Sequence, residues 1–104
     1  MIARVWKAIA TSSHVADYKH HFENSVSPEL KTIEGFHGAY ILTRDLSDNV
    51  EITVMTHWES MAAIHKFAGE NAEVAVVEPA AQAVLESFDK TVIHYEVALN
   101  WQAR

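Results

Sequence analysis

The sequence contains no cysteine, so it offers no disulfide framework, no thiolate nucleophile and no Cys-based metal site. Glycine is scarce, and the three glycines at positions 35, 38 and 69 do not form a phosphate-binding loop. No apolar run approaches the roughly 20 residues that span a bilayer. The first ten residues, MIARVWKAIA, lack the pattern of a secretory signal peptide. These absences favour a soluble cytoplasmic protein.

Basic residues are also few, eight against 14 acidic ones, which gives a formal net charge of −6. They are scattered singly along the chain, at Arg4, Lys7, Lys19, Lys31, Arg44, Lys66, Lys90 and Arg104. A nucleic-acid-binding face needs clustered basic residues, and an anionic membrane attracts the same pattern. The charge distribution therefore argues against nucleic acid and membrane as partners.

What the chain does contain is typical of a globular protein, with 49% apolar and 10% aromatic residues. Its 104 residues predict one domain that covers residues 1–104. A domain this short buries only about two thirds of its unfolded surface, so dimerisation would supplement its stability.

Hydrophobic patterning predicts strands at residues 1–10, 36–45, 50–58 and 91–98. Residues 47–48 predict a turn that joins the two middle strands in a hairpin. A first helix is expected after the candidate N-cap residues 11–13, with Val15, Tyr18, Phe22 and Val26 at helical spacing and Pro28 interrupting it.

A second helix is expected to begin after the N-cap Ser60 and to end at Gly69. A further helical stretch is predicted from about residue 72 to 88, with a kink or restart at Pro79. The order βαββαβ predicts an α+β, ferredoxin-like fold with a four-stranded antiparallel sheet and both helices on one face.

The predicted strands are apolar on both faces, which has a consequence for assembly. In the third strand Ile52, Val54 and Trp58 point one way and Met55 points the other. Because helices cover only one face, the second face is expected to pack against another sheet. The simplest partner is a second copy of the chain, in a homodimer.

Three short stretches carry a resemblance to a known family: IEGFHGAYIL before the hairpin, THWES at the strand-helix junction, and VIHYEVA in the last strand. Together they resemble the antibiotic-biosynthesis-monooxygenase group of dimeric α+β-barrel proteins. That group includes cofactor-independent oxygenases of polycyclic phenols and quinols, haem-degrading monooxygenases and members without a known activity. The resemblance implies a dimer whose two sheets close a barrel, with each pocket between a sheet and its helices.

The resemblance also indicates site residues. Phenol-oxidising members use a Trp in the W-E-S motif, here Trp58, with an Asn four residues earlier and a Tyr six residues later, where this chain has Val54 and Ile64. Haem-degrading members use a Trp and an axial His at the positions of Phe67 and Val77. By resemblance, Trp58 is a catalytic residue, and Val54, Ile64 and Phe67 contact the substrate.

Histidines supply the remaining candidates, because an imidazole suits abstraction of a phenolic proton. The hairpin brings His37 opposite residues 57–58, where it would pair with Trp58 if the register allows. His65 follows Ile64 and could act as a base or a haem ligand, although a boundary position is the commoner case. Tyr95 would orient the substrate if it shares the pocket face. The chain has no local metal-binding motif, so no metal is expected.

These residues leave three functions open. The first is a monooxygenase without a bound cofactor that acts on a small aromatic or polycyclic phenol or quinol. The second is a haem-binding or haem-degrading protein, with His65 or another histidine as axial ligand. The third is a non-catalytic dimeric module that binds a small hydrophobic aromatic ligand in the same cavity.

Overall fold

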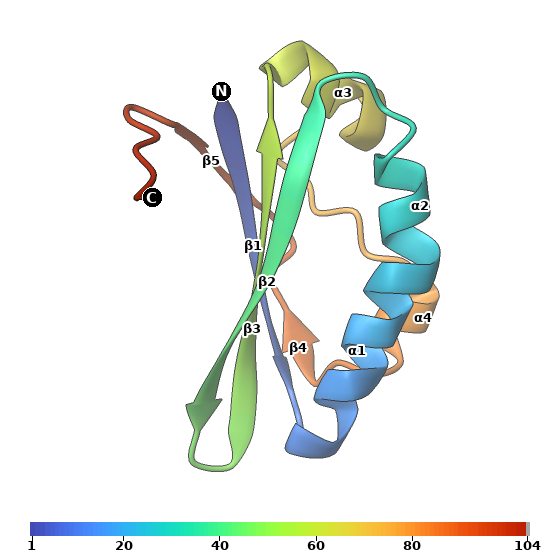
Figure 1. Ribbon diagram of the computed structural model, residues 1–104. Coiled ribbons are helices and arrows are strands. Elements are labelled where there is room, and N and C mark those ends of the chain that lie inside the picture. The colour runs from blue at the N-terminus through green and yellow to red at the C-terminus, as the bar shows by residue number, and fades with distance from the viewer. Residues whose placement is uncertain (104) are drawn as a thin grey trace.

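An antiparallel sheet of five strands forms one layer of the molecule, and helices cover one of its faces (Figure 1). The computed structural model describes residues 1–103. The long strands β1 (Ile2–Ala10), β2 (Phe36–Leu46) and β3 (Asn49–Trp58) lie in the order β2-β3-β1. The short strands β4 (Ser87–Phe88) and β5 (Ile93–Glu96) pair with opposite halves of β1. The α+β, ferredoxin-like prediction is confirmed.

The predicted number of strands was four, and the structure has five. The last strand is shorter than expected, and the additional strand β4 comes from residues that were assigned to a helix. The pairings Ala8↔Phe88 and Val5↔Ile93 explain the division, because β1 is long enough to pair with two short segments in succession.

The central hairpin follows the prediction closely. Strands β2 and β3 meet at Ser47 and Asp48, and Ser47 takes a positive φ of 42°. Even-numbered residues of β3 are buried, whereas odd-numbered residues between them are half-buried. This alternation follows from the pleat, which turns successive side chains to opposite faces. It confirms the division of Val54 and Trp58 from Met55.

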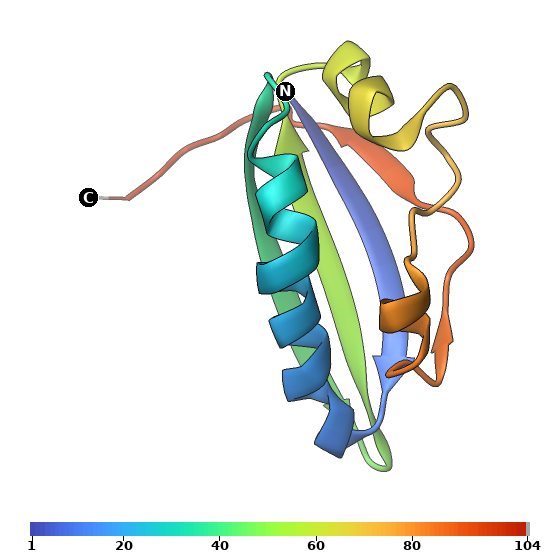
Figure 2. The same ribbon diagram turned by 90° about the vertical axis from the view of Figure 1, so that its right-hand side faces the viewer.

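The first helical layer is a continuous rod that runs along the strands on one face of the sheet (Figure 2). It consists of α1 (Val15–His21), the π-helical segment η2 (Phe22–Val26) and α2 (Ser27–Leu30). The rod buries Tyr18 and Phe22, as their helical spacing predicted. Proline 28 does not end the rod: it occupies the first turn of α2, where a missing N–H is tolerated.

The start of this rod differs from the prediction. A 3₁₀ turn, η1 (Ser12–His14), precedes α1, and no side chain caps either helix. The Thr11 hydroxyl contacts Ser13 Oγ at 3.1 Å instead of a backbone N–H. The predicted cap was therefore wrong, because the two hydroxyl groups pair with each other.

The second helix, α3 (Met61–Ala68), begins and ends as predicted. Ser60 Oγ accepts a hydrogen bond from the backbone N–H of Ala63. Gly69 follows the helix with a φ of 82°, a conformation that favours glycine.

The predicted helix over residues 72–88 was wrong except for α4 (Pro79–Gln82). Residues 69–78, which we call the wall segment, have irregular backbone with turns and a bridge between Val74 and Thr91. Several β-branched residues lower the helix propensity of this segment. Pro79 also drives Glu78 out of the helical region, to φ −70° and ψ 153°.

Helices cover one face of the sheet and leave the other face open (Figure 1). The helix-covered face holds the core, in which Trp58, Leu30, Ile52 and Ile64 are the largest fully buried side chains. On the other face large apolar side chains are exposed, including Tyr40, Leu42, Ile93 and Tyr95. We call these four residues the open-face cluster.

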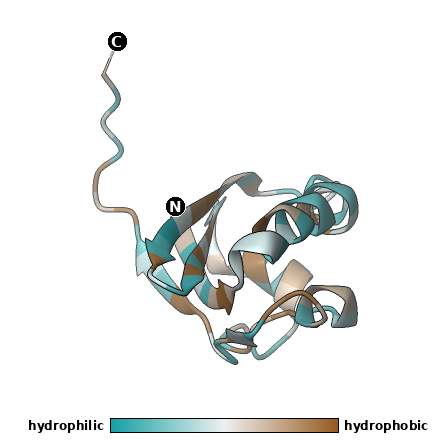
Figure 3. Cartoon of the chain, turned by 90° about the horizontal axis from the view of Figure 1, so that it is seen from below, coloured by the Kyte–Doolittle hydropathy of each residue, from teal (hydrophilic) through white to brown (hydrophobic). Residues whose placement is uncertain are grey.

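The C-terminal residues after β5 lead away from both layers (Figures 2 and 3). Leu99 and Trp101 in this tail are 79% and 77% exposed. Within residues 1–103 no helix has the length and apolarity needed to cross a membrane.

Candidate functional site

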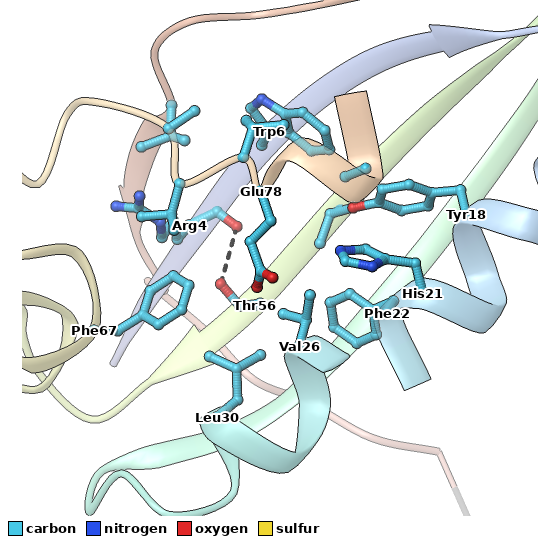
Figure 4. A pocket seen from close by; sticks show the side chains of 16 residues that line it. Arg4, Trp6, Tyr18, His21, Phe22, Val26, Leu30, Thr56, Phe67 and Glu78 are labelled. Atoms are coloured by element: carbon cyan, nitrogen blue, oxygen red, sulfur yellow. Dashed lines mark hydrogen bonds between the residues drawn. The ribbon is translucent and has the colours of Figure 1, made fainter. Parts of the chain in front are cut away.

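A cavity of about 70 Å³ lies between the helix-covered face of the sheet, the first helical rod and the wall segment (Figure 4). Its lining is largely apolar, and includes Trp6, Phe22, Val26, Leu30, Val54, Phe67, Val77 and Ala81. Five lining residues carry polar groups: Arg4, Tyr18, His21, Thr56 and Glu78.

The strands supply one wall through their alternation. Even-numbered residues of β1 and β3 point to the helix-covered face, and the pairs Arg4↔Thr56 and Trp6↔Val54 bring four lining residues side by side. The rod supplies the opposite wall. The wall segment closes the third side.

Thr56 is fully engaged by neighbouring groups. Its Oγ1 accepts a hydrogen bond of 2.8 Å from Trp58 Nε1, and it lies 3.5 Å from the carbonyl oxygen of Arg4, to which it donates. This arrangement satisfies the indole N–H of Trp58 in the core. Thr56 therefore fixes the wall and has no donor left for a ligand.

Arg4 ties the wall segment to the sheet. Its guanidinium donates to the carbonyl oxygens of Ala72 and Val74, and Nη1 lies 3.0 Å from His94 Nε2. The Phe67 ring centre lies 6.0 Å from the guanidinium carbon. Arg4 is only 5% exposed, and burial lowers its pKa from 12.5 to about 10.

Glu78 and His21 are the acid-base groups of the cavity. Figure 4 shows the Glu78 carboxylate directed into the middle of the cavity, near Thr56, with the His21 ring on the side of the helical rod. Tyr18 lies next to them, and burial raises the pKa of its hydroxyl group, which stays protonated. A carboxylate and an imidazole in an apolar cavity can exchange a proton with a bound ligand.

Two of the residues predicted to bind substrate, Val54 and Phe67, line the cavity. Ile64 and Trp58 are fully buried and are not among the lining residues. The Trp58 ring packs behind the cavity, 5.1 Å from the Phe36 ring centre and 5.9 Å from that of Phe67. Trp58 thus supports a lining residue rather than lining the cavity itself.

The structure does not bring the other predicted residues to the cavity. His37 is exposed in a bulge, where Phe36 pairs with Trp58 and Gly38 pairs with His57. His65 is exposed on α3, with Nδ1 2.8 Å from the carbonyl oxygen of Gly69. Tyr95 is 53% exposed and pairs with Ala3 on the opposite face of the sheet.

Sequence reasoning missed Arg4, His21 and Glu78 as cavity residues. Arg4 lies two residues before Trp6, so the alternation of a strand places both on one face. His21 precedes Phe22, which belongs to the apolar stripe of the first helix. No comparable pattern marks Glu78, which lies within the predicted helix over residues 72–88.

A second depression, of about 310 Å³, lies at the edge of the sheet between β1, β3 and β4. Charged residues line it, including Lys7, Glu51 and Asp89, and none of the predicted site residues is among them. Within residues 1–103, no group of three or more His, Asp or Glu side chains is arranged to hold a metal ion.

Comparison with known proteins identifies the family. The family model described as antibiotic biosynthesis monooxygenase matches residues 1–77, which include the first helical rod, the hairpin and α3. The chain belongs to the antibiotic biosynthesis monooxygenase family. No curated protein sequence matches it.

Several solved structures share the fold at low sequence identity. A Bacillus cereus protein classed with the antibiotic biosynthesis monooxygenases has a TM-score of 0.73 at 16% identity, over 100% of this chain and 97% of that chain. A Deinococcus radiodurans protein of the same class has a TM-score of 0.64 at 15% identity, over 100% and 99%. The haem-degrader MhuD of Mycobacterium tuberculosis, with two haems in its active site, has a TM-score of 0.53 at 22% identity, over 98% and 100%.

Proposed function

We propose that the cavity binds a small phenol or quinol and that the protein promotes its oxidation by dioxygen without a bound cofactor. The observation that carries this proposal is the combination of an aromatic-lined cavity with two proton acceptors, His21 and Glu78. Membership of the antibiotic biosynthesis monooxygenase family supports it. His21 and Glu78 take the role of proton acceptor that the sequence analysis gave to His37, because His37 lies outside the cavity.

The chemistry needs little more than deprotonation and exclusion of water. Loss of the hydroxyl proton makes the aromatic ring electron-rich, and the ring then reacts with dioxygen. One oxygen atom enters the product, which becomes a quinone, and the other leaves as water, so that no external reductant is required. Trp6, Phe22 and Phe67 would hold the ring by aromatic packing.

The size of the cavity limits the ligand. Its volume of about 70 Å³ is below the roughly 150 Å³ of an engineered cavity that holds benzene. A ligand therefore requires an outward shift of the wall segment. Few backbone hydrogen bonds hold this segment to the residues that precede β5. The Ala75 N–H donates to the carbonyl oxygen of Lys90 at 2.9 Å, and the Val92 N–H donates to the carbonyl oxygen of Glu73 at 2.8 Å.

Oxygen consumption tests the proposal. Purified protein is mixed with a panel of monocyclic and bicyclic phenols, hydroquinones and anthrones, and dioxygen uptake is followed together with quinone absorbance. Val54→Phe should abolish turnover because it fills the cavity, whereas Leu42→Phe, on the open face of the sheet, should leave turnover unchanged. Absence of oxygen uptake above the uncatalysed rate for every compound would contradict the proposal.

Haem binding is the second candidate, and the fold shared with MhuD favours it. The cavity does not fit haem in this conformation, because ligand pockets for molecules of drug size hold about 300–1,000 Å³. His21 is the one histidine among the described cavity-lining residues. A Soret shift on addition of haem, removed by His21→Ala but not by His65→Ala, would support haem binding through the cavity.

A non-catalytic ligand-binding module is the third candidate. It uses the same apolar cavity, so it shares the binding of small aromatic ligands with the first candidate. Saturable binding of phenols without any oxygen uptake would support this function over the monooxygenase.

We also propose a homodimer in which the open faces of two sheets pack together. The open-face cluster supports this partner, because its four large apolar residues are 45–59% exposed and lie on one side of the sheet. His57 lies on the same face, and its ring centre is 5.8 Å from that of Tyr40. Burial of this face would supplement the small core of a chain of 104 residues.

A further inference from the structure

Glu78 has an unusual position for a carboxylate. It is half-buried, and it is the one acidic residue among the described residues that line the cavity. Its carboxylate points into the middle of the cavity (Figure 4). A carboxylate that is partly withdrawn from water gains from a hydrogen-bond donor that compensates the lost hydration, so the donors around it are relevant.

Within residues 1–103 no ion pair supplies such a donor to Glu78. The one ion pair within residues 1–103 joins Arg44 and Glu51, so no basic side chain there neutralises Glu78. The Thr56 hydroxyl lies 3.5 Å from the carbonyl oxygen of Arg4 and donates to it. Trp6 Nε1 donates to the carbonyl oxygen of Asp89 at 2.7 Å, outside the cavity. The Thr56 hydroxyl and the Trp6 indole N–H are thus engaged elsewhere, whereas the Tyr18 hydroxyl and the His21 ring line the same cavity as the carboxylate.

Glu78 is the last residue of the wall segment, and its backbone is anchored to α4. Its carbonyl oxygen accepts hydrogen bonds from the N–H groups of Ala81, at 3.0 Å, and Gln82, at 3.1 Å. The ring of Pro79 fixes the next φ angle. The Glu78 side chain makes no capping hydrogen bond to α4, so it does not contribute to the helix start. These contacts leave the carboxylate oxygens free to accept from a ligand.

We propose that Glu78 accepts the hydroxyl proton of the ligand, so that the cavity selects neutral aromatic ligands that carry an O–H group. This inference rests on the proposed function and specifies its proton acceptor. An ionised carboxylate has only acceptor sites, and it therefore rejects a ligand whose oxygen carries a methyl group instead. In the transfer step the ligand O–H bond breaks, the proton bonds to a Glu78 oxygen, and the electron pair of the bond stays on the ligand oxygen.

Binding without oxygen tests the selectivity. The probes are phenol and methoxybenzene, which have similar shapes but differ in the O–H group, and the Trp6 indole N–H signal in NMR spectra follows their binding under anaerobic conditions. We expect phenol to bind at least about tenfold more tightly, as one hydrogen bond to a charged acceptor allows. Glu78→Leu should remove this preference. Glu70→Gln, which alters an exposed carboxylate of the wall segment, should preserve it.

Turnover tests the proton transfer. Glu78→Gln keeps the size of the side chain and one acceptor oxygen but cannot take the proton, so kcat should fall about 10²-fold or more while KM changes less than about threefold. An unchanged kcat, or a phenol preference that is missing in the wild type or retained in Glu78→Leu, would overturn the inference. A Glu78-dependent preference without any turnover would instead overturn the proposed oxidation and support Glu78 as the ligand-binding acceptor.

Discussion

His94 Nε2 lies 3.0 Å from Arg4 Nη1. The two residues occupy paired positions on the neighbouring strands β5 and β1. Because a guanidinium has only donors, His94 accepts through Nε2 and carries its proton on Nδ1. Arg4 also donates to the carbonyl oxygens of Ala72 and Val74. One buried arginine therefore joins the sheet, the last strand and the wall of the cavity.

This contact makes stability depend on pH. Burial lowers the pKa of His94 below 6.5, the positive charge of Arg4 lowers it further, and Glu73 opposes the shift. His94 therefore binds a proton more readily in the unfolded chain than in the folded one. The stability that neutral His94 contributes is present above pH 6.5 and is lost as the pH falls toward the pKa of His94 in the folded state. Urea unfolding between pH 5 and 8 should show lower stability at acid pH. His94→Gln should flatten this profile, and the exposed substitution His14→Gln should not; equal slopes in both variants would contradict the assignment.

Trp58 should contribute strongly to stability whatever its catalytic role. The ring is fully buried and donates to Thr56 at 2.8 Å. Trp58→Ala should lower the free energy of unfolding by about 3–5 kcal/mol, and Trp58→Phe should cost less because it keeps an aromatic ring in the core. Trp101→Ala, at a position that is 77% exposed, is the control and should unfold like the wild type in dilute solution. A loss below about 1 kcal/mol for Trp58→Ala would show that the core does not depend on this ring.

Two glycines close to the start of β2 should respond differently to the same substitution. Gly35 has a φ of +96°, and an added Cβ would lie 2.7 Å from the Cβ of Ala63. Gly35→Ala should therefore cost about 1–3 kcal/mol through backbone strain and the clash with α3. Gly38 has nothing within 4 Å of an added Cβ, so Gly38→Ala should be nearly neutral in thermal unfolding. Equal melting temperatures for the two variants would disprove the difference in environment.

The proposed homodimer can be tested by charge on the open face. Tyr40→Lys combined with Ile93→Lys should place like charges at the interface, and the variant should be a monomer by light scattering at micromolar concentration. Ala16→Lys, on the exposed side of α1, should leave a dimer. A wild-type protein that scatters as a monomer would refute the proposed interface.

Particular residues show how far the sequence could be interpreted. Ser60 and Gly69 marked the ends of α3 correctly, because a cap and a positive φ depend on neighbours within a few positions. The hairpin turn at Ser47 was found for the same reason. His37 was not placed, because a single bulge at residues 36–38 changes which side chain pairs with Trp58.

The sequence by itself determined the alternation of the strands, the buried face of the first helix, α3 and the family, since these depend on local periodicity and short motifs. Only the tertiary structure decided the cavity. Arg4 bonds the wall segment to the sheet, and that segment places Glu78 in the same cavity as His21, 57 positions earlier in the chain. Contacts at such separation leave no periodic signal in the sequence, because they depend on where the sheet directs its side chains. The residues with the chemistry of the site were therefore visible only in the fold.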